Sequence, residues 1–438
     1  MMKFFKNALV GRHVGLLLLV MCWVACQNIG VQRVDSTWTE DAVIYEVNVR
    51  QFTPEGTFDA FAKHLPRLKD LGVDILWLMP IHPIGVLERK GTLGSYYAVR
   101  DYTAVNPEFG TIDAFKALVD KAHELDLKVI IDWVPNHTSP DAVWATHKDW
   151  YLTDSLGNFV IQYDWTDIAQ LDYNNRDMRR AMIDAMLYWV TETDIDGFRC
   201  DVAWNVPVDF WEPATKELTA VKSSLFMLAE AEEPPLMQKA FNMYYAWNLH
   251  HVMNEVAQGN ADANALRVGL EEMMNRFPRY AIPMYFTSNH DENSWSGTEF
   301  ERMGDAARTF AALTYLLPGM PLIYNGQEVG FDRRLLFFEK DEINWTDSYG
   351  YTPFYRELNT LRKNNRALHS QEVGGILIEI ENSAPNAIFS FKREVVGNRV
   401  IALFNLSPQE QNVSFYGDYP ELSTITELQP WEYRIIVH

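Results

Sequence analysis

Short apolar runs and amphipathic stretches alternate along residues 43–367. A continuous apolar run is typical of a buried parallel strand, whereas apolar residues at every third or fourth position, as in 177–192, predict a helix with one buried face. The predicted strands are 43–52, 75–81, 128–134, 197–202, 224–230, 244–250, 282–289 and 321–328. Because these eight strands alternate with helices, the pattern predicts an α/β fold, a parallel (β/α)8 TIM barrel, over residues 43–370.

Two regions depart from this alternation. Residues 138–172, after the third predicted strand, are rich in Trp, Tyr, Asp and Asn, and we expect a short excursion beside the barrel mouth. After residue 370 the chain changes to short β-prone runs separated by Gly, Pro, Asn and Asp, which predicts a C-terminal antiparallel β domain over 371–438. Its predicted strands are 376–380, 388–391, 400–404, 413–415 and 433–437.

The N-terminal segment has the features of a targeting signal. Basic residues precede an apolar run, residues 14–24, that is too short to span a membrane comfortably. The run ends Trp-Val-Ala-Cys at Cys26, which is similar to a bacterial lipoprotein processing box. We therefore expect a signal peptide over 1–25, a lipid on Cys26 and a linker over 26–42. The protein would then be exported and anchored to a membrane, in the periplasm or at the cell surface. The alternative is an ordinary secretory signal.

Composition and charge narrow the class of partner. The chain has 438 residues, 47% of them hydrophobic, which is ample for a large core and excludes disorder. A net charge of −21 disfavours nucleic acid, which needs a basic surface. If the signal is removed and Cys26 carries a lipid, Cys200 is the one cysteine left with a free thiol. We therefore expect no disulfide within the mature chain. We expect a monomer that acts on a neutral substrate.

Charged side chains gather where predicted strands end. In a parallel barrel the carboxyl ends of the strands build the active site. The groups at these ends are Asp132, Asn136 and His137 in or after strand 128–134, Arg199 and Asp201 in strand 197–202, Glu230 at the end of strand 224–230, and His290 and Asp291 after strand 282–289. Each buried charge costs desolvation energy unless it is paired or serves a site. The convergence therefore predicts an active site.

Glycoside hydrolysis is a reaction that would use this combination of carboxyl groups and a neighbouring arginine. It needs two carboxyl groups flanking the scissile bond, one a proton donor and the other a nucleophile or base. Arg199 and Asp201 share a face of their strand, and a neighbouring cation lowers a carboxyl pKa. We therefore expect Arg199 to keep Asp201 ionised. Glu230 follows an apolar run, which favours the raised pKa of a proton donor.

The same segments resemble the motifs of the α-amylase family of glycoside hydrolases, also called family thirteen. Order, spacing and strand context agree at 132–137, 197–201, Glu230 and 286–291, and the segments 97–102, 106–111 and 319–328 agree as well. The resemblance covers roughly residues 40–438. It implies a retaining glycosidase that cleaves α-glucosidic bonds, mainly α-1,4, in starch-like glucans or maltooligosaccharides.

Carried over residue by residue, the resemblance assigns roles to the strand-end groups. It implies that Asp201 is the nucleophile, Glu230 the acid/base and Asp291 the stabiliser of the transition state. Tyr97 would stack under the sugar that is cleaved, and Asp132 would support its strand from beneath. The residues that would bind that sugar or the carboxylates are His137, Arg199 and His290.

The chain departs from the family pattern just after the predicted nucleophile. Many members carry Lys-His where this chain has Trp204 and Asn205. In those enzymes the Lys meets leaving-group sugars and the His backbone helps to hold calcium. We expect Trp204 to stack on an acceptor sugar, the alternative being loop packing. Asn136 matches a family calcium ligand, but one Asn is a weak metal signal, so we expect no cofactor and keep calcium as the alternative.

Other residues have both a functional and a structural interpretation. His82 either contributes to a substrate subsite or packs within its loop. His250 and His251 suggest a metal pair but lack the spacing of a zinc motif, so a helix start explains them better. Aromatic residues of the excursion would either grip glucan or, more often, pack: Trp144, Trp150, Tyr151, Tyr163 and Trp165.

Two other functions remain as alternatives to an α-1,4-glucan hydrolase. One is an α-1,6-cleaving or transglycosylating enzyme on the same scaffold. The other is a non-catalytic glucan-binding lipoprotein, which the presence of all three carboxylates disfavours. The pattern does not decide between endo and exo action.

Overall fold

A computed structural model describes residues 37–438 of the chain. The predicted signal segment 1–25, the predicted lipidation site Cys26 and most of the linker lie outside the described residues. Within the described part of the chain, no helix is both long and apolar enough to cross a membrane.

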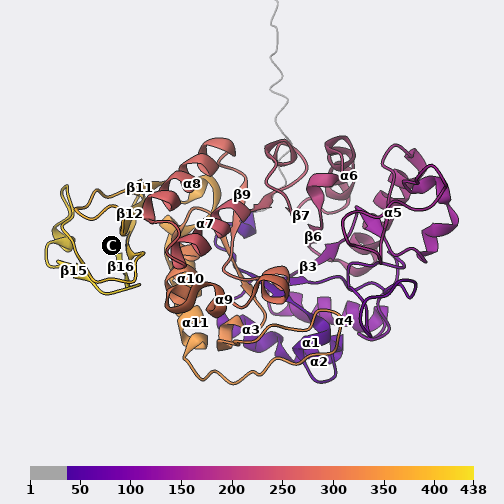
Figure 1. Cartoon of the computed structure of the whole chain (residues 1–438), viewed down its shortest axis with the longest axis horizontal. Helices are drawn as coiled ribbons and strands as arrows, with labels where there is room; N and C mark the ends of the chain where they lie inside the picture. Colours follow the sequence, from indigo (N-terminus) through magenta and orange to yellow (C-terminus); the bar gives the residue numbers. More distant parts are fainter. Residues whose placement is uncertain (1–36) are drawn as a thin grey trace, which may run out of the picture. The chain divides into compact units, whose positions relative to one another are not determined.

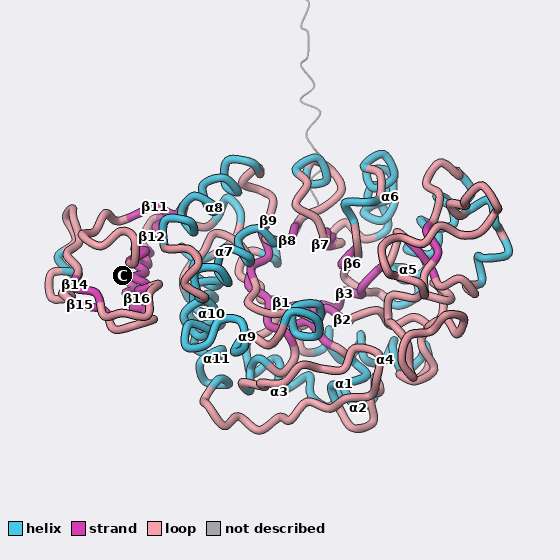
Figure 2. The backbone as a smooth tube through the Cα atoms, in the orientation of Figure 1, coloured by secondary structure: helices cyan, strands magenta, loops and turns pink. Residues whose placement is uncertain are grey.

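Eight parallel strands close into a barrel, which confirms the predicted fold class (Figures 1 and 2). Their order around the barrel is β1-β10-β9-β8-β7-β6-β3-β2. The strands are β1 (Ile44–Val47), β2 (Ile75–Leu78), β3 (Lys128–Trp133), β6 (Gly197–Cys200), β7 (Phe226–Ala229), β8 (Met243–Tyr245), β9 (Ile282–Tyr285) and β10 (Met320–Tyr324). The barrel closes where Ile44 of β1 pairs with Leu322 of β10.

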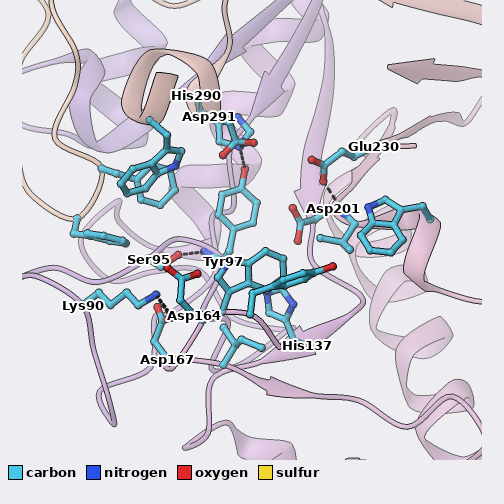
Figure 3. Close-up of a pocket in the computed structure, with 18 residues that line it drawn as sticks. Lys90, Ser95, Tyr97, His137, Asp164, Asp167, Asp201, Glu230, His290 and Asp291 are labelled. Atoms are coloured by element: carbon cyan, nitrogen blue, oxygen red, sulfur yellow. Dashed lines mark hydrogen bonds and ion pairs between the residues drawn. The ribbon is translucent and has the colours of Figure 1, made fainter. Parts of the chain in front are cut away.

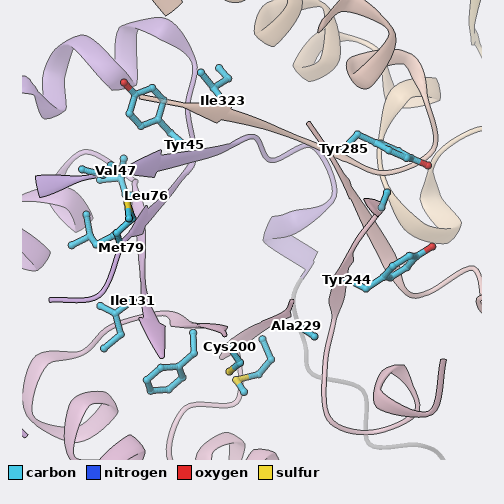
Figure 4. Close-up of a cluster of buried hydrophobic side chains, with 14 of the residues drawn as sticks. Tyr45, Val47, Leu76, Met79, Ile131, Cys200, Ala229, Tyr244, Tyr285 and Ile323 are labelled. Carbon is cyan, nitrogen blue, oxygen red and sulfur yellow. The ribbon is translucent and has the colours of Figure 1, made fainter. Parts of the chain in front are cut away.

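Alternation along each strand divides the core into an inner and an outer layer. Ile75 and Trp77 of β2 join the cluster that fills the barrel, whereas Leu76 and Leu78 join the larger cluster between strands and helices. Figure 4 shows part of this outer layer, with Tyr45, Leu76, Ile131, Cys200 and Ile323 among its labelled side chains. Cys200 is fully buried there, which confirms that it is a small core residue.

Helices surround the strands. They are α1 (Val49–Phe52), α2 (Phe58–Phe61), α3 (Leu65–Leu71), α4 (Ile112–Glu124), α5 (Arg176–Thr193), α6 (Val208–Val221), α7 (Trp247–Ala257), α8 (Ala263–Arg276), α9 (Glu299–Met303), α10 (Ala307–Leu316) and α11 (Tyr351–Asn364). The predicted strands 43–52 and 244–250 were too long, because α1 and α7 begin directly after the strands. The apolar positions continue into these helices, with Val49 and Phe52 in α1 and Trp247 and Leu249 in α7, so they could not locate the boundary.

The excursion after β3 folds back on itself. It starts at β4 (His137–Thr138), which pairs antiparallel with β5 (Ala169–Gln170). Between them, Tyr151 bridges to Leu171 and Thr153 to Phe159. These pairings fix both ends of the segment at the rim of the barrel.

The C-terminal strands form an antiparallel sheet in the order β11-β12-β13-β16. They are β11 (Leu377–Glu379), β12 (Ile388–Val395), β13 (Asn398–Asn405) and β16 (Tyr433–Val437), and β14 (Gln411–Asn412) pairs separately with β15 (Glu427–Leu428). The predicted strand 413–415 was wrong, because the chain leaves β14 at Asn412 and Phe415 makes only an isolated bridge to Asn382. Buried Arg393 of β12 donates to the carbonyls of Leu316 and Leu317, which ties this sheet to the end of α10.

Candidate active site

A cavity of about 930 Å³ opens at the carboxyl ends of the barrel strands (Figure 3). Most of the predicted site residues line it together: Tyr97, His137, Asp201, Trp204, Glu230, His290 and Asp291. Arg199 does not line the cavity. It lies beneath the carboxylates and is fully buried. The groups predicted at the strand ends thus surround this cavity, and Arg199 is the buried cation beneath them.

Arg199 connects three carboxylates. Its Nη1 lies 2.9 Å from Oδ1 of Asp132 and 3.0 Å from Oδ1 of Asp201. Its Nη2 lies 3.0 Å from Oε2 of Glu230. The Nε donates to the hydroxyl of Tyr245 in β8 at 3.1 Å. One guanidinium from β6 therefore holds acidic groups from β3, β6 and β7 in fixed positions.

The pKa of Asp201 contradicts the expectation from sequence. Burial raises it well above its usual range and the charge of Glu230 raises it further, while Arg199 lowers it only in part. The expectation that Arg199 keeps the pKa of Asp201 low was wrong, because burial of the carboxyl group and the charge of Glu230 outweigh the opposing charge of Arg199. Burial likewise raises the pKa of Asp132 to about 6, against the opposing charge of Arg199.

The backbone after Asp201 is bent to meet Glu230. Val202 has φ +46°, in the left-handed region that β-branched residues rarely adopt. In this conformation its backbone N–H donates to Oε2 of Glu230 at 2.7 Å. Unfavourable backbone conformations of this kind gather at functional sites, where the surrounding structure holds them in place. Here it aims a hydrogen-bond donor at the carboxyl group predicted to move the proton.

Tyr97 and His290 form one wall of the cavity. Their rings stack with centroids 5.3 Å apart, and the Tyr97 hydroxyl lies 2.7 Å from Nε2 of His290. That hydroxyl also donates to Oδ2 of Asp132 at 3.0 Å. Burial disfavours a charged imidazole, but the carboxylates of Asp291 and Glu46 outweigh it and raise the pKa of His290 to about 9. The ring is therefore protonated at neutral pH.

Glu46 was missed by the sequence argument. It is fully buried in β1, and its Oε1 accepts a hydrogen bond from Nδ1 of His290. A glutamate within the apolar run Val-Ile-Tyr-Glu-Val was the available signal. It was overlooked because it stands inside the strand and not at the end of the run.

His137 and Trp204 also border the cavity. Burial lowers the pKa of His137 to about 4, so its ring is neutral at physiological pH and can accept a hydrogen bond from a hydroxyl group. Trp204 keeps 47% of its surface exposed although it lines the cavity. A half-exposed indole beside Asp201 offers a flat apolar face to a ligand.

The candidate calcium ligand is occupied by protein groups. Oδ1 of Asn136 accepts a hydrogen bond from Nδ2 of Asn205 at 2.9 Å, and Nδ2 of Asn136 faces Gln162 at 3.2 Å. A donor N–H aimed at the ligand oxygen is unfavourable for a cation. Among residues 37–438, no cluster of three or more His, Cys, Asp or Glu side chains could hold a metal ion. The expectation that the protein needs no calcium stays a prediction.

The remaining sequence candidates divide between packing and the cavity. His82 is fully buried against Trp133 and Trp189, which assigns it to packing. His250 lies in α7 with Nε2 3.1 Å from Glu292, so the helix interpretation holds. In the excursion, Tyr163 and Trp165 line the cavity, while the other three aromatic residues pack against the core: Trp144, Trp150 and Tyr151.

Several lining residues lie on loops that the sequence argument did not reach. They are Lys90, Ser95, Asp164, Asp167, Trp295, Phe337 and Phe338. Lys90 and Ser95 follow β2, Trp295 follows β9, and the two phenylalanines follow β10. No periodicity or spacing marks such residues, because long loops place them.

Comparison with known proteins agrees with this site. The family model for the α-amylase catalytic domain matches residues 33–149 and 145–348. The chain belongs to the α-amylase family. It is therefore a glycosidase by family, and its barrel and predicted motifs fall within the matched region.

Individual members of the α-amylase family resemble the chain over most of its length. The α-amylase MalA of Haloarcula japonica is 28% identical over 417 residues, which cover 91% of this chain but only 59% of that relative. A crystal structure of an α-amylase from Lactobacillus plantarum has a TM-score of 0.81 and 32% identity, over 91% of this chain and 99% of that one. The maltogenic α-amylase AmyB of Thermotoga neapolitana has a TM-score of 0.79 and 33% identity, over 86% and 88%.

Proposed function

We propose that this α-amylase family member hydrolyses α-1,4-glucosidic bonds in starch-like glucans or maltooligosaccharides with retention of configuration. The observation that carries the proposal is the meeting of Asp201, Glu230 and Asp291 in one cavity beside the Tyr97 ring. Two carboxyl groups held by a common arginine supply a nucleophile and a proton donor. A third carboxylate stabilises the positive charge that develops on the sugar.

In the first step Asp201 attacks the anomeric carbon while Glu230 donates its proton to the departing oxygen. The glycosidic bond breaks and a glycosyl ester forms on Asp201. Glu230 then removes a proton from water, which attacks the same carbon and releases the ester. The reactive form in this mechanism has the proton on Glu230, with Asp201 ionised and paired with Arg199.

The experiment replaces each carboxyl group with its amide. Asp201→Asn and Glu230→Gln should each lower kcat on maltooligosaccharides by a factor of roughly a thousand or more, because each removes a covalent or proton-transfer step. Glu230→Gln should retain more of its first step on α-glucosyl fluoride, whose leaving group needs little protonation. A glycosyl-enzyme should then accumulate, with the mass increase on the peptide that contains Asp201.

Asp209→Asn is the matched control, because Asp209 is an exposed carboxylate of α6 paired with Arg179 outside the cavity. It should leave turnover unchanged. Nuclear magnetic resonance should detect an α-configured first product. A β product, or a label on another carboxylate, contradicts the mechanism.

Transglycosylation is the second candidate activity. It is favoured by Trp204, which stays half exposed next to Asp201 and could hold an acceptor sugar in place of water. We also propose that the protein is exported and anchored by a lipid on Cys26, on the strength of the apolar run that precedes it.

A further inference from the structure

Lys90 connects two loops across one end of the cavity. Its Nζ lies 3.3 Å from Oδ1 of Asp167 and donates to the carbonyl oxygen of Asp164 at 3.1 Å. The carboxylate of Asp167 is only 5% exposed, so water screens this ion pair little. Lys90 belongs to the loop after β2, and its partners belong to the excursion after β3. We refer to Lys90, Asp164 and Asp167 as the loop bridge.

The loop that carries Lys90 is itself held from the other side. The backbone N–H of Leu93 donates to the carbonyl of Phe338 at 3.0 Å, and that of Thr92 donates to Glu339 at 2.9 Å. Phe338 and Glu339 follow β10. The loops after β10, β2 and β3 are therefore joined one to the next, and they form a continuous rim along this end of the cavity.

The rim lies on the donor side of the scissile bond. Glu230 must face the departing oxygen, so the leaving-group sugar occupies the side of Glu230 and Trp204. The sugars that remain attached to Asp201 extend the other way. Figure 3 shows Glu230 and Lys90 on opposite sides of Tyr97, so the loop bridge stands where the donor chain would continue.

We propose that the loop bridge closes the donor end of the cavity, so that the enzyme acts at the non-reducing ends of maltooligosaccharides and releases one short sugar of uniform length. This inference rests on the proposed glucan hydrolase function. A polymer interior would need an exit at both ends of the cavity, and the bridge removes one of them. Lys90 is thus a specificity-determining residue, and its ammonium group and the Asp167 carboxylate are positioned to bind the terminal hydroxyl groups.

The test compares wild type with Lys90→Ala, Lys90→Met and Asp167→Asn. The substrate is maltoheptaose labelled at its reducing end, with soluble starch assayed in parallel. Lys90→Met retains the length of the side chain without its charge, and therefore separates loss of the ion pair from loss of bulk. The control is Lys116→Ala, since Lys116 of α4 pairs with exposed Glu192 at 3.4 Å outside the cavity.

Wild type and Lys116→Ala should shorten the labelled chain stepwise from the unlabelled end and release a single short product. Lys90→Ala should release a mixture that includes longer sugars. For each reducing end produced, it should lower the viscosity of starch several-fold more than wild type. Lys90→Met and Asp167→Asn should shift the products in the same direction.

Two results overturn the inference: scattered internal cleavage by wild type, or products of Lys90→Ala identical to those of wild type at full activity. Failure of the proposed function looks different, because wild type would then leave both glucans intact. Unchanged melting temperatures of the variants confirm that any shift in products comes from the cavity.

Discussion

Glu46 and His290 form a buried ion pair in which Oε1 of Glu46 lies 2.5 Å from Nδ1 of His290. Glu46 comes from β1 and His290 follows β9, so the contact joins two strands that are separated in the barrel by β10. The other ring nitrogen faces the hydroxyl of Tyr97 and, at 3.3 Å, Oδ2 of Asp291. Glu46 is therefore a positioning residue, which acts on the site through the orientation and charge of the imidazole.

Glu46→Gln should lower the pKa of His290, because it removes one of the two carboxylates that raise that pKa to about 9. The imidazole of His290 is protonated at pH values below its pKa. A lower pKa therefore means that the ring loses its proton at a lower pH. The alkaline limb of kcat/KM should move down by about one to three pH units. Near pH 5, where both proteins hold a protonated ring, their activities should converge.

The control is Glu301→Gln, since Glu301 pairs with Arg334 on the surface at 2.8 Å. Its pH profile should match wild type. A uniform loss of activity at every pH in Glu46→Gln would contradict a role in the charge of His290 and indicate a structural role.

Trp204→Ala tests whether the half-exposed indole binds an acceptor sugar. A stacked aromatic ring contributes about 1 kcal/mol, so kcat/KM on maltooligosaccharides should fall roughly fivefold to tenfold. The ratio of transfer to hydrolysis should fall with it, as measured by chromatography at high substrate concentration. The melting temperature should hold. Trp295→Ala is the matched control, because Trp295 is also a half-exposed indole of the cavity but contacts Phe337.

Chelation tests the contact between Asn205 and Asn136. Because an amide N–H already occupies Oδ1 of Asn136, excess EDTA should change the melting temperature by less than about one degree. A bound structural ion would instead stabilise the fold by mass action. Scanning calorimetry with and without calcium is the measurement. A drop of many degrees that calcium reverses would contradict the assignment.

Cys26→Ser tests the proposed lipid anchor. Wild type should partition into the detergent phase of a membrane extract, and the variant should either appear in the soluble fraction or keep its signal segment. Mass spectrometry of the N-terminal peptide identifies the lipid. A soluble wild-type protein that begins beyond residue 26 would show that the segment is an ordinary secretory signal.

The sequence predicted the barrel and its strand-end groups because both follow local rules. Parallel strands are apolar on both faces, and charged groups tolerated beside them, such as Asp201 and Glu230, must serve a site. The raised pKa of Asp201 could not be predicted in the same way. It depends on burial and on the charge of Glu230, which are set by packing between strands that lie far apart in the sequence.

The loop residues that line the cavity could not be predicted from the sequence for a different reason. Lys90 meets Asp167 only because the loops after β2 and β3 extend to the same end of the cavity, and no periodicity encodes that meeting. The role of Glu46 was not predicted, because a single glutamate in an apolar strand has many structural explanations. Its partner, His290, lies far along the chain.

The pairing of β1 with β10 has a consequence for how the chain reaches its native state. Ile44 cannot meet Leu322 until nearly all of the barrel sequence is present, so folding depends on contacts of very long sequence separation. Until then the edges of β1 and β9 offer unpaired backbone groups to other chains. We expect slow refolding with a yield that falls as protein concentration rises, and a chain shortened before residue 320 should aggregate instead of forming a smaller barrel.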